Sequence, residues 1–140
     1  MRIVSCLLFC LASLAAAATP ETAIRAVLSA QVEAWNRGDI PAFMDGYDRS
    51  DQTLFVGKDI AHGWQQVMDR YRKNYSNKEQ MGTLRFEIEK VDRLGSKYAN
   101  VVGRFILARS AASGGDSSGV FTLLFEKKSG AWKIVQDHTT

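Results

Sequence analysis

The chain has 140 residues, of which 46% are hydrophobic and 24% are charged, and its formal net charge is +3. These values are typical of one globular domain and exclude a disordered, collagen-like or low-complexity chain. The two cysteines are too few for a disulfide-rich scaffold, and no Cys and His residues are spaced as zinc ligands. Acidic and basic residues alternate along the chain, so we expect no nucleic-acid partner.

The first 18 residues have the layout of a secretory signal peptide. Arg2 gives a positive start, residues 3–14 are almost entirely apolar, and residues 15–18 are alanines that a signal peptidase accepts. The apolar segment is too short to span a bilayer comfortably, so we expect cleavage near Ala18 and no stable membrane insertion afterwards. The domain that remains, residues 19–140, would be periplasmic or secreted and would contain neither cysteine.

Three helices are predicted in the first half of this domain. Thr19 and Pro20 favour the start of a helix whose apolar residues recur at three- and four-residue steps until Gly38. Asp39 is expected to cap a short second helix. A third helix is predicted to begin near Gly63, because residues 64–75 again place apolar side chains on one helical face.

The remaining segments favour strands. A short strand is expected at residues 53–56, between the second and third helices. After residue 80 the pattern alternates, which predicts strands at 84–89, 99–108, 120–126 and 131–139, with a glycine-rich loop at 113–119. Helices followed by consecutive antiparallel strands indicate the α+β class, with the helices packed on one face of the sheet.

Several short motifs resemble the NTF2-like superfamily, and more narrowly its DUF4440 branch, also described as SnoaL-like or ketosteroid-isomerase-like. The motifs are Asn36-Arg37-Gly38-Asp39, Tyr47, Gly63-Trp64, Trp132-Lys133-Ile134-Val135 and Asp137-His138-Thr139-Thr140. The resemblance covers about residues 22–140. It implies a cystatin-like cone, in which a curved antiparallel sheet wraps around three N-terminal helices and leaves an apolar pocket at its open end. It also implies a homodimer through the outer face of the sheet.

The catalytic set of ketosteroid isomerase is not found at the matching positions. That enzyme uses a carboxylate base, a tyrosine and a protonated aspartate. The position of its tyrosine corresponds here to Gln31, and neither residues 53–56 nor residues 121–125 contain a carboxylate. Steroid-isomerase chemistry is therefore not expected, and whether the protein is an enzyme stays open.

His138 is the remaining candidate catalytic residue. Two-residue steps place Trp132, Ile134, Gln136 and His138 on one face of the last strand. If that face points into the cone, the imidazole of His138 lies near the mouth, where it could transfer protons. The alternative is a structural histidine at the end of the strand. Asp137 falls on the opposite face, where we expect it to be exposed or at a dimer contact.

We predict a pocket lined by aromatic rings with a few polar groups. Its candidate residues are Gln31, Trp35, Tyr47, Phe55, Trp64, Tyr71, Trp132, Gln136 and His138. The leading interpretation is an exported domain that binds a small apolar molecule, with no cofactor and no metal. One alternative is a SnoaL-like enzyme of the isomerase, cyclase or dehydratase type that uses His138 with Gln31 or Tyr47. Another is a non-catalytic structural dimer whose own side chains fill the cavity.

Overall fold

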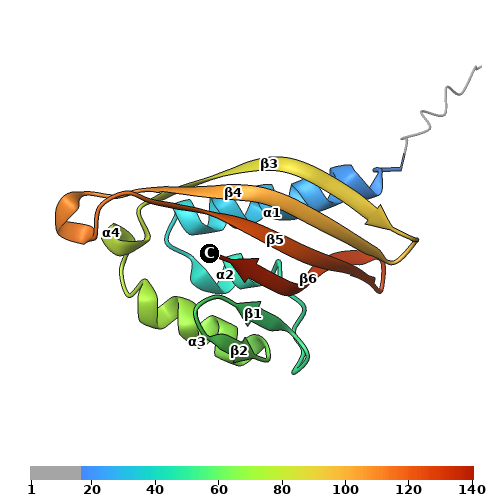
Figure 1. The fold of residues 1–140 in the computed structure, drawn as a ribbon, viewed down its shortest axis with the longest axis horizontal. Coiled ribbons are helices and arrows are strands. Elements are labelled where there is room, and N and C mark those ends of the chain that lie inside the picture. Colours follow the sequence, from blue (N-terminus) through green and yellow to red (C-terminus); the bar gives the residue numbers. More distant parts are fainter. Residues whose placement is uncertain (1–16) are drawn as a thin grey trace, which may run out of the picture.

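The computed structural model describes residues 17–140, which form a long curved sheet with helices along one side (Figure 1). The helices are α1 (Pro20–Asn36), α2 (Ile40–Met44), α3 (Trp64–Asn74) and α4 (Lys78–Met81), with a 3-10 turn at Ala111–Ser113. The strands are β1 (Leu54–Val56), β2 (Ile60–His62), β3 (Thr83–Leu94), β4 (Tyr98–Ala108), β5 (Ser117–Lys128) and β6 (Ala131–Thr139). The predicted signal peptide lies, except for its last two residues, outside the described residues.

The sheet has six strands in the order β2-β1-β6-β5-β4-β3. All neighbouring strands are antiparallel except β1 and β6, which run parallel. The predicted α+β class, with helices packed on one face of a sheet, is confirmed. Sequence periodicity missed β2 and α4, because segments of three and four residues are too short to display a period.

The predicted helix caps are present. The Thr19 side chain accepts a hydrogen bond from the backbone N–H of Thr22 at 3.2 Å, and Pro20 occupies the first helical position of α1. Gly38 follows α1 with a φ of 82°, a left-handed conformation that favours glycine. The Asp39 side chain accepts from the N–H of Ala42 at 2.9 Å and starts α2.

Asn36 joins the end of α1 to the start of β3. Its Nδ2 donates to the backbone oxygen of Leu84 at 3.0 Å, and the backbone N–H of Leu84 donates to its Oδ1 at 2.7 Å. The amide therefore occupies both backbone hydrogen-bonding groups of one residue at the edge of the sheet. This contact fixes α1 across the concave face, where it buries Ile24, Leu28 and Trp35.

One extra residue in β6 changes the alternation of that strand. Phe125 of β5 pairs with Ile134, but the preceding residue of β5 pairs with Gln136, so Val135 has no partner of its own. Such a β-bulge bends a strand and reverses which residues point inward beyond it. Ile134 is buried before the bulge, and Asp137 is buried after it.

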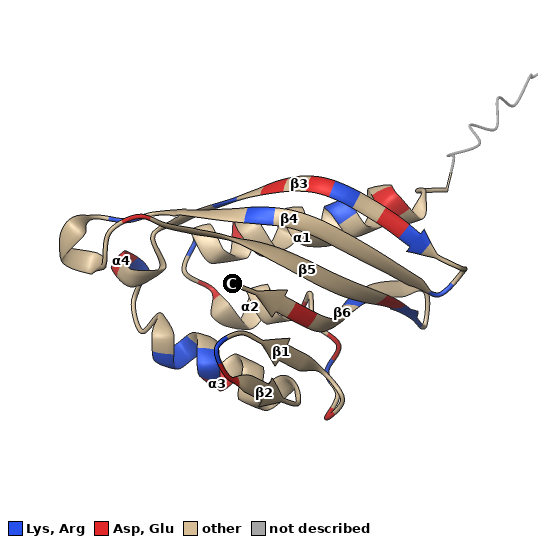
Figure 2. Ribbon diagram, viewed as in Figure 1, with Lys and Arg blue, Asp and Glu red and all other residues tan. Residues whose placement is uncertain are grey.

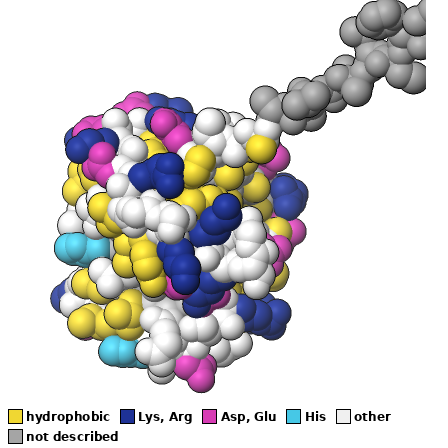
Figure 3. All heavy atoms as spheres, turned by 90° about the vertical axis from the view of Figure 1, so that its right-hand side faces the viewer, with side chains coloured by type: hydrophobic (Ala, Val, Ile, Leu, Met, Phe, Trp, Pro, Cys, Tyr) yellow, Lys and Arg dark blue, Asp and Glu magenta, His cyan; other side chains and the backbone are white. Residues whose placement is uncertain are grey.

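Charges of both signs are distributed over the surface. Figure 2 shows basic and acidic residues along the same strand in β3, and basic residues in the second half of α3. On the face seen in Figure 3, Lys and Arg side chains lie among acidic and hydrophobic ones. No helix within residues 17–140 is long and apolar enough to cross a membrane.

Candidate functional site

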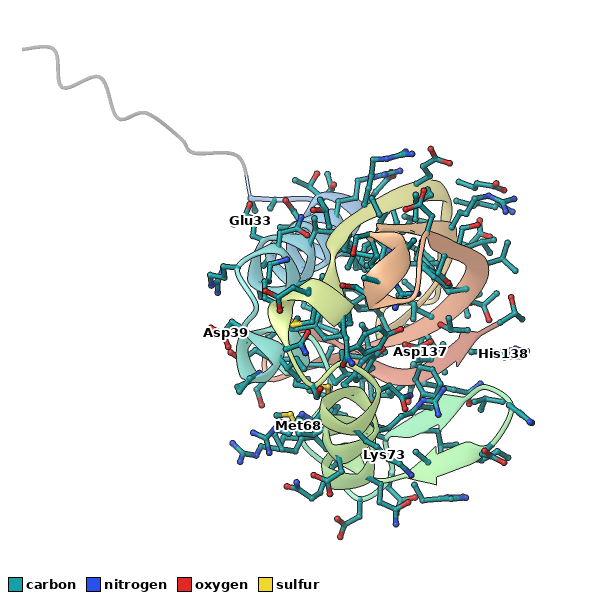
Figure 4. All side chains as sticks on the ribbon, turned by 90° about the vertical axis from the view of Figure 1, so that its left-hand side faces the viewer. Glu33, Asp39, Met68, Lys73, Asp137 and His138 are labelled. Carbon is teal, nitrogen blue, oxygen red and sulfur yellow. The ribbon has the colours of Figure 1, made fainter. Side chains whose placement is uncertain are left out.

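A cavity of about 240 Å³ lies against the concave face of the sheet, between α1, α2 and α3. Its lining residues share aromatic or long aliphatic side chains for the most part, with polar groups on one side. They are Gln31, Trp35, Phe43, Tyr47, Phe55, Arg70, Tyr71, Asn74, Tyr75, Leu84, Phe86, Phe105, Leu107, Phe121, Leu123, Ile134, Asp137, Thr139 and Thr140. The partly exposed members lie in the second half of α3 and at one end of β3, β4 and β6, which identifies the mouth. Figure 4 views the molecule from the side of α4.

Aromatic rings form one wall of the cavity. The ring of Trp35 packs edge-on against Phe43 at 5.1 Å and against Tyr75 at 4.8 Å between centroids. Tyr71 lies 5.1 Å from Phe43 and 6.0 Å from Phe55 in the same edge-to-face manner. The indole nitrogen of Trp35 donates to the backbone oxygen of Met81 at 2.8 Å, so this ring is held in one orientation. The wall is therefore apolar and preorganised.

A chain of hydrogen bonds forms the polar side of the cavity. The hydroxyl of Tyr47 donates to Oδ2 of Asp137 at 2.6 Å, and the hydroxyl of Thr139 donates to Oδ1 at 2.5 Å. The hydroxyl oxygens of Tyr47 and Tyr71 are 2.9 Å apart. Because Tyr47 directs its proton to the carboxylate, Tyr71 must donate to Tyr47. The oxygen of Tyr71 then keeps a lone pair that a ligand donor can use.

Burial raises the pKa of Asp137 above its ordinary value, whereas the hydrogen bonds from Thr139 and Tyr47 and the positive charge of Arg70 act in the opposite direction. Burial, followed by the charge of Asp137, also raises the pKa of Tyr47 and Tyr71 well above the ordinary tyrosine value. Both phenols are therefore protonated at neutral pH. Burial of Asp137 favours the neutral form of its carboxyl, and the hydrogen bonds from Thr139 and Tyr47 favour the ionised form.

Gln31 contributes an amide to the cavity wall. Its Nε2 donates to the backbone oxygen of Phe43 at 3.1 Å. The bare backbone of Gly46 makes room for this side chain, since a Cβ there would lie 2.7 Å from Nε2. The amide oxygen of Gln31 makes no hydrogen bond within residues 17–140, so it can accept one from a ligand.

The structure brings together part of the predicted pocket. The residues that line the cavity as predicted are Gln31, Trp35, Tyr47, Phe55 and Tyr71. Trp64 does not line it, because its indole nitrogen donates to the backbone oxygen of Met44 on another side of α3, at 3.2 Å. Trp132 is 4% exposed and belongs to the hydrophobic core.

The predicted positions of Gln136 and His138 are wrong. Both side chains are exposed, and neither lines the cavity. The bulge at Val135 reverses the inward and outward faces, so Asp137 points inward and His138 outward (Figure 4). The expectation that Asp137 is exposed or at a dimer contact is wrong for the same reason, because this residue is 3% exposed.

Sequence reasoning also missed Arg70, Asn74 and Thr139, which line the mouth. Arg70 directly precedes Tyr71 on α3, and this adjacency was the available signal. Among residues 17–140, no group of three or more His, Cys, Asp and Glu side chains is arranged to hold a metal ion.

The fold and the cavity define an NTF2-like, cystatin-like cone. A family model described as the SnoaL-like domain matches residues 24–139, so the chain belongs to the SnoaL-like family. The predicted superfamily is thereby confirmed. Among proteins with curated descriptions, none matched this chain.

Solved structures agree with this assignment. An NTF2-like protein of unknown function from Shewanella oneidensis MR-1 is 39% identical, with a TM-score of 0.81 over 86% of this chain and 98% of the other. A domain of unknown function with a cystatin-like fold from Nostoc punctiforme PCC 73102 has 20% identity and a TM-score of 0.71, over 86% and 75%. A ketosteroid isomerase-like protein from Erwinia carotovora atroseptica SCRI1043 has 22% identity and a TM-score of 0.64, over 84% and 92%. The last two similarities concern the fold alone.

Proposed function

We propose that this domain binds a small, mainly apolar molecule in the cavity. The observation that carries the proposal is the cavity of about 240 Å³, whose aromatic wall faces a hydrogen-bonded carboxylate on the other side. Sites for small molecules have this composition, with a few polar groups that orient the ligand. The volume also argues against the alternative in which the side chains of the protein fill the cone.

The polar groups of the cavity favour a ligand with one polar end. The hydroxyl of Tyr71 is at the free end of the chain that leads to Asp137 through Tyr47. Leucine and phenylalanine side chains from β3, β4 and β5 surround the rest of the space. An apolar body would therefore lie among these side chains, with its polar group at the mouth of the cavity.

A pair of neighbouring substitutions tests binding. Leu123 lines the cavity, whereas Leu124 points to the outer face of the same strand. We expect mass spectrometry to find a small molecule with the purified wild type and Leu124→Phe, but not with Leu123→Phe, whose added ring occupies the cavity. Circular dichroism would establish that both variants are folded. Absence of any bound molecule, together with no binding of phenyl and naphthyl probes to the wild type, would overturn the proposal.

A second candidate function is proton transfer on a carbonyl compound. The observation that favours it is the buried carboxyl of Asp137, with its raised pKa, linked by 2.6 Å and 2.9 Å hydrogen bonds to two phenols. Such a group can hold or move a proton inside an apolar site. Asp137 takes the role that the sequence had suggested for His138.

Deuterium exchange tests this second function. Ketones with acidic α-protons would be incubated in D2O, and exchange would be followed by NMR. An enzyme is expected to accelerate exchange in the wild type and in His138→Gln, but not in Asp137→Asn. Exchange at the buffer rate in the wild type would exclude this activity for the ketones tested.

We further propose that the protein is exported to the periplasm or secreted, and that it forms a homodimer through the outer face of the sheet. The layout of residues 1–18 supports export. Apolar residues on both faces of β4, such as Val101 and Val102, support the dimer.

A further inference from the structure

Arg70 brings a positive charge to the mouth of the cavity. It is located on α3 and lines the cavity next to Tyr71. The guanidinium carbon lies 4.4 Å from the centroid of the Phe55 ring. A guanidinium that stacks on an aromatic face keeps the N–H groups around its edge free to donate. The stacking therefore holds the guanidinium in place and leaves its N–H groups free to donate.

No other side chain neutralises Arg70 at close range. Within residues 17–140 the Arg70 side chain makes no hydrogen bond and no ion pair. The charge of Arg70 lowers the pKa of Asp137, but both oxygens of Asp137 already accept hydrogen bonds, from Tyr47 and Thr139. The donors of Arg70 are thus available to a bound molecule.

Gly57 lies beside the stacked side chains of Phe55 and Arg70. A Cβ at this position would lie 3.0 Å from Cε1 of Phe55 and 3.4 Å from Nη2 of Arg70. The φ of Gly57 is not in the left-handed region, so backbone conformation does not require glycine there. Its lack of a side chain instead leaves room for the Phe55 ring on which the guanidinium stacks.

We propose that the ligand of this cavity is a monocarboxylate with an apolar body, and that Arg70 binds its carboxylate at the mouth. This inference rests on the proposed binding function. The planar guanidinium matches a carboxylate through two parallel N–H···O bonds. Asn74, one helical turn after Arg70, also lines the mouth and offers a neutral donor. A dianion such as a phosphate monoester fits less well, because Arg70 is the one cationic side chain among the described residues that line the cavity.

Matched acids and amides separate the role of the charge from that of the cavity. The probes are phenylacetate, 1-naphthylacetate and decanoate, each compared with its primary amide by isothermal titration calorimetry at pH 7.5. A charge-assisted pair predicts that at least one acid binds the wild type about tenfold or more tightly than its amide. Arg70→Gln should bind acid and amide equally and keep the wild-type affinity for the amide.

Two further variants sharpen the test. Arg72→Gln removes an exposed charge from the same helix, away from the cavity wall, and should keep the preference for the acid. Gly57→Ala keeps every charge but crowds the Phe55 ring that supports the guanidinium, and should weaken that preference. Equal binding of acid and amide to the wild type, or an unchanged preference in Arg70→Gln, would overturn the inference while leaving the binding function intact. If no probe of either kind binds the wild type, both proposals fail.

Discussion

The hydroxyl oxygen of Tyr47 lies 2.6 Å from Oδ2 of Asp137, although 90 positions separate the two residues in the sequence. Tyr47 follows α2, and Asp137 lies in the last strand, so the contact joins the helical layer to the sheet. Both side chains are buried, which makes the loss of either partner costly.

Tyr47→Phe is expected to lower the free energy of unfolding by about 1–3 kcal/mol, because it removes a donor from a buried carboxyl. It should also raise the pKa of Asp137 further, since the Tyr47 hydrogen bond lowers that pKa. Urea denaturation and NMR titration of the carboxyl carbon would measure the two effects. Tyr98→Phe is the control, because Tyr98 is 39% exposed and its hydrogen bond to Glu126 is 3.4 Å long. Equal stability of the two variants would contradict the assigned contact.

Asp137 should make stability depend on pH. Its folded pKa is raised above the ordinary value of 3.8, so the native state keeps a proton that the unfolded chain has released. Its stabilising contribution is present below pH 3.8 and is lost as the pH rises through the folded pKa. The unfolding free energy of the wild type minus that of Asp137→Asn should therefore fall with rising pH. Urea denaturation from pH 4 upward tests this. Parallel curves for wild type and Asp137→Asn would contradict it.

Asn36 is expected to contribute to stability through its two bonds to Leu84. Asn36→Ala should lower the free energy of unfolding by about 1–3 kcal/mol, because it leaves backbone groups at the start of β3 without partners. Arg37→Ala removes only an exposed ion pair to Asp39, 3.6 Å long, and should change stability by less than about 1 kcal/mol. Thermal or chemical denaturation compares the two neighbours. A smaller loss for Asn36→Ala than for Arg37→Ala would count against this role.

The proposed homodimer predicts a dimer mass by light scattering at micromolar protein concentration. Leu124→Lys should give a monomer, because it places a charge on the outer face of β5, an inner strand of the sheet. Leu94→Lys is the control: Leu94 is 51% exposed, at the end of an edge strand. A monomeric wild type would disprove the dimer, and a dimeric Leu124→Lys would disprove its location.

Export predicts a mature protein that begins near Thr19. Thr19 caps the first helix, so cleavage after Ala18 would leave this cap intact. The mature chain should fold equally well with and without reductant, because Cys6 and Cys10 precede the predicted site. N-terminal sequencing of protein from the periplasm or medium measures the start. A chain that still contains either cysteine would refute the prediction.

The fold was largely predictable from sequence, because its long helices and strands repeat their patterns over many residues. Thr19, Gly38 and Asp39 marked helix ends through local chemistry that depends on few neighbours. Helical spacing also placed Gln31 and Trp35 correctly on the cavity side of α1. Short elements such as β2 were not predictable in this way, because three residues are too few to show a period.

The polar side of the site was not predictable by counting alternate residues. Counting alternate residues assumes a regular strand. Val135 interrupts the alternation, because it is the extra residue where β6 pairs with β5, and this pairing cannot be seen from the residues of β6 alone. Arg70 was missed for a different reason, since an arginine at the edge of an amphipathic helix resembles any solvated residue. Its adjacency to Tyr71 was the signal in the sequence, and its position over the ring of Phe55 is visible in the structure alone.

The bulge at Val135 has a consequence for how this family could diversify. Without the extra residue, the alternation along β6 would point His138 inward, and its imidazole would take the place of the carboxyl of Asp137 in the cavity. A shift of one residue would then exchange an acid for a base while the rest of the cone kept its place. Relatives that differ in length at this point of the strand would differ in the chemistry of their pockets, even where the flanking residues are identical.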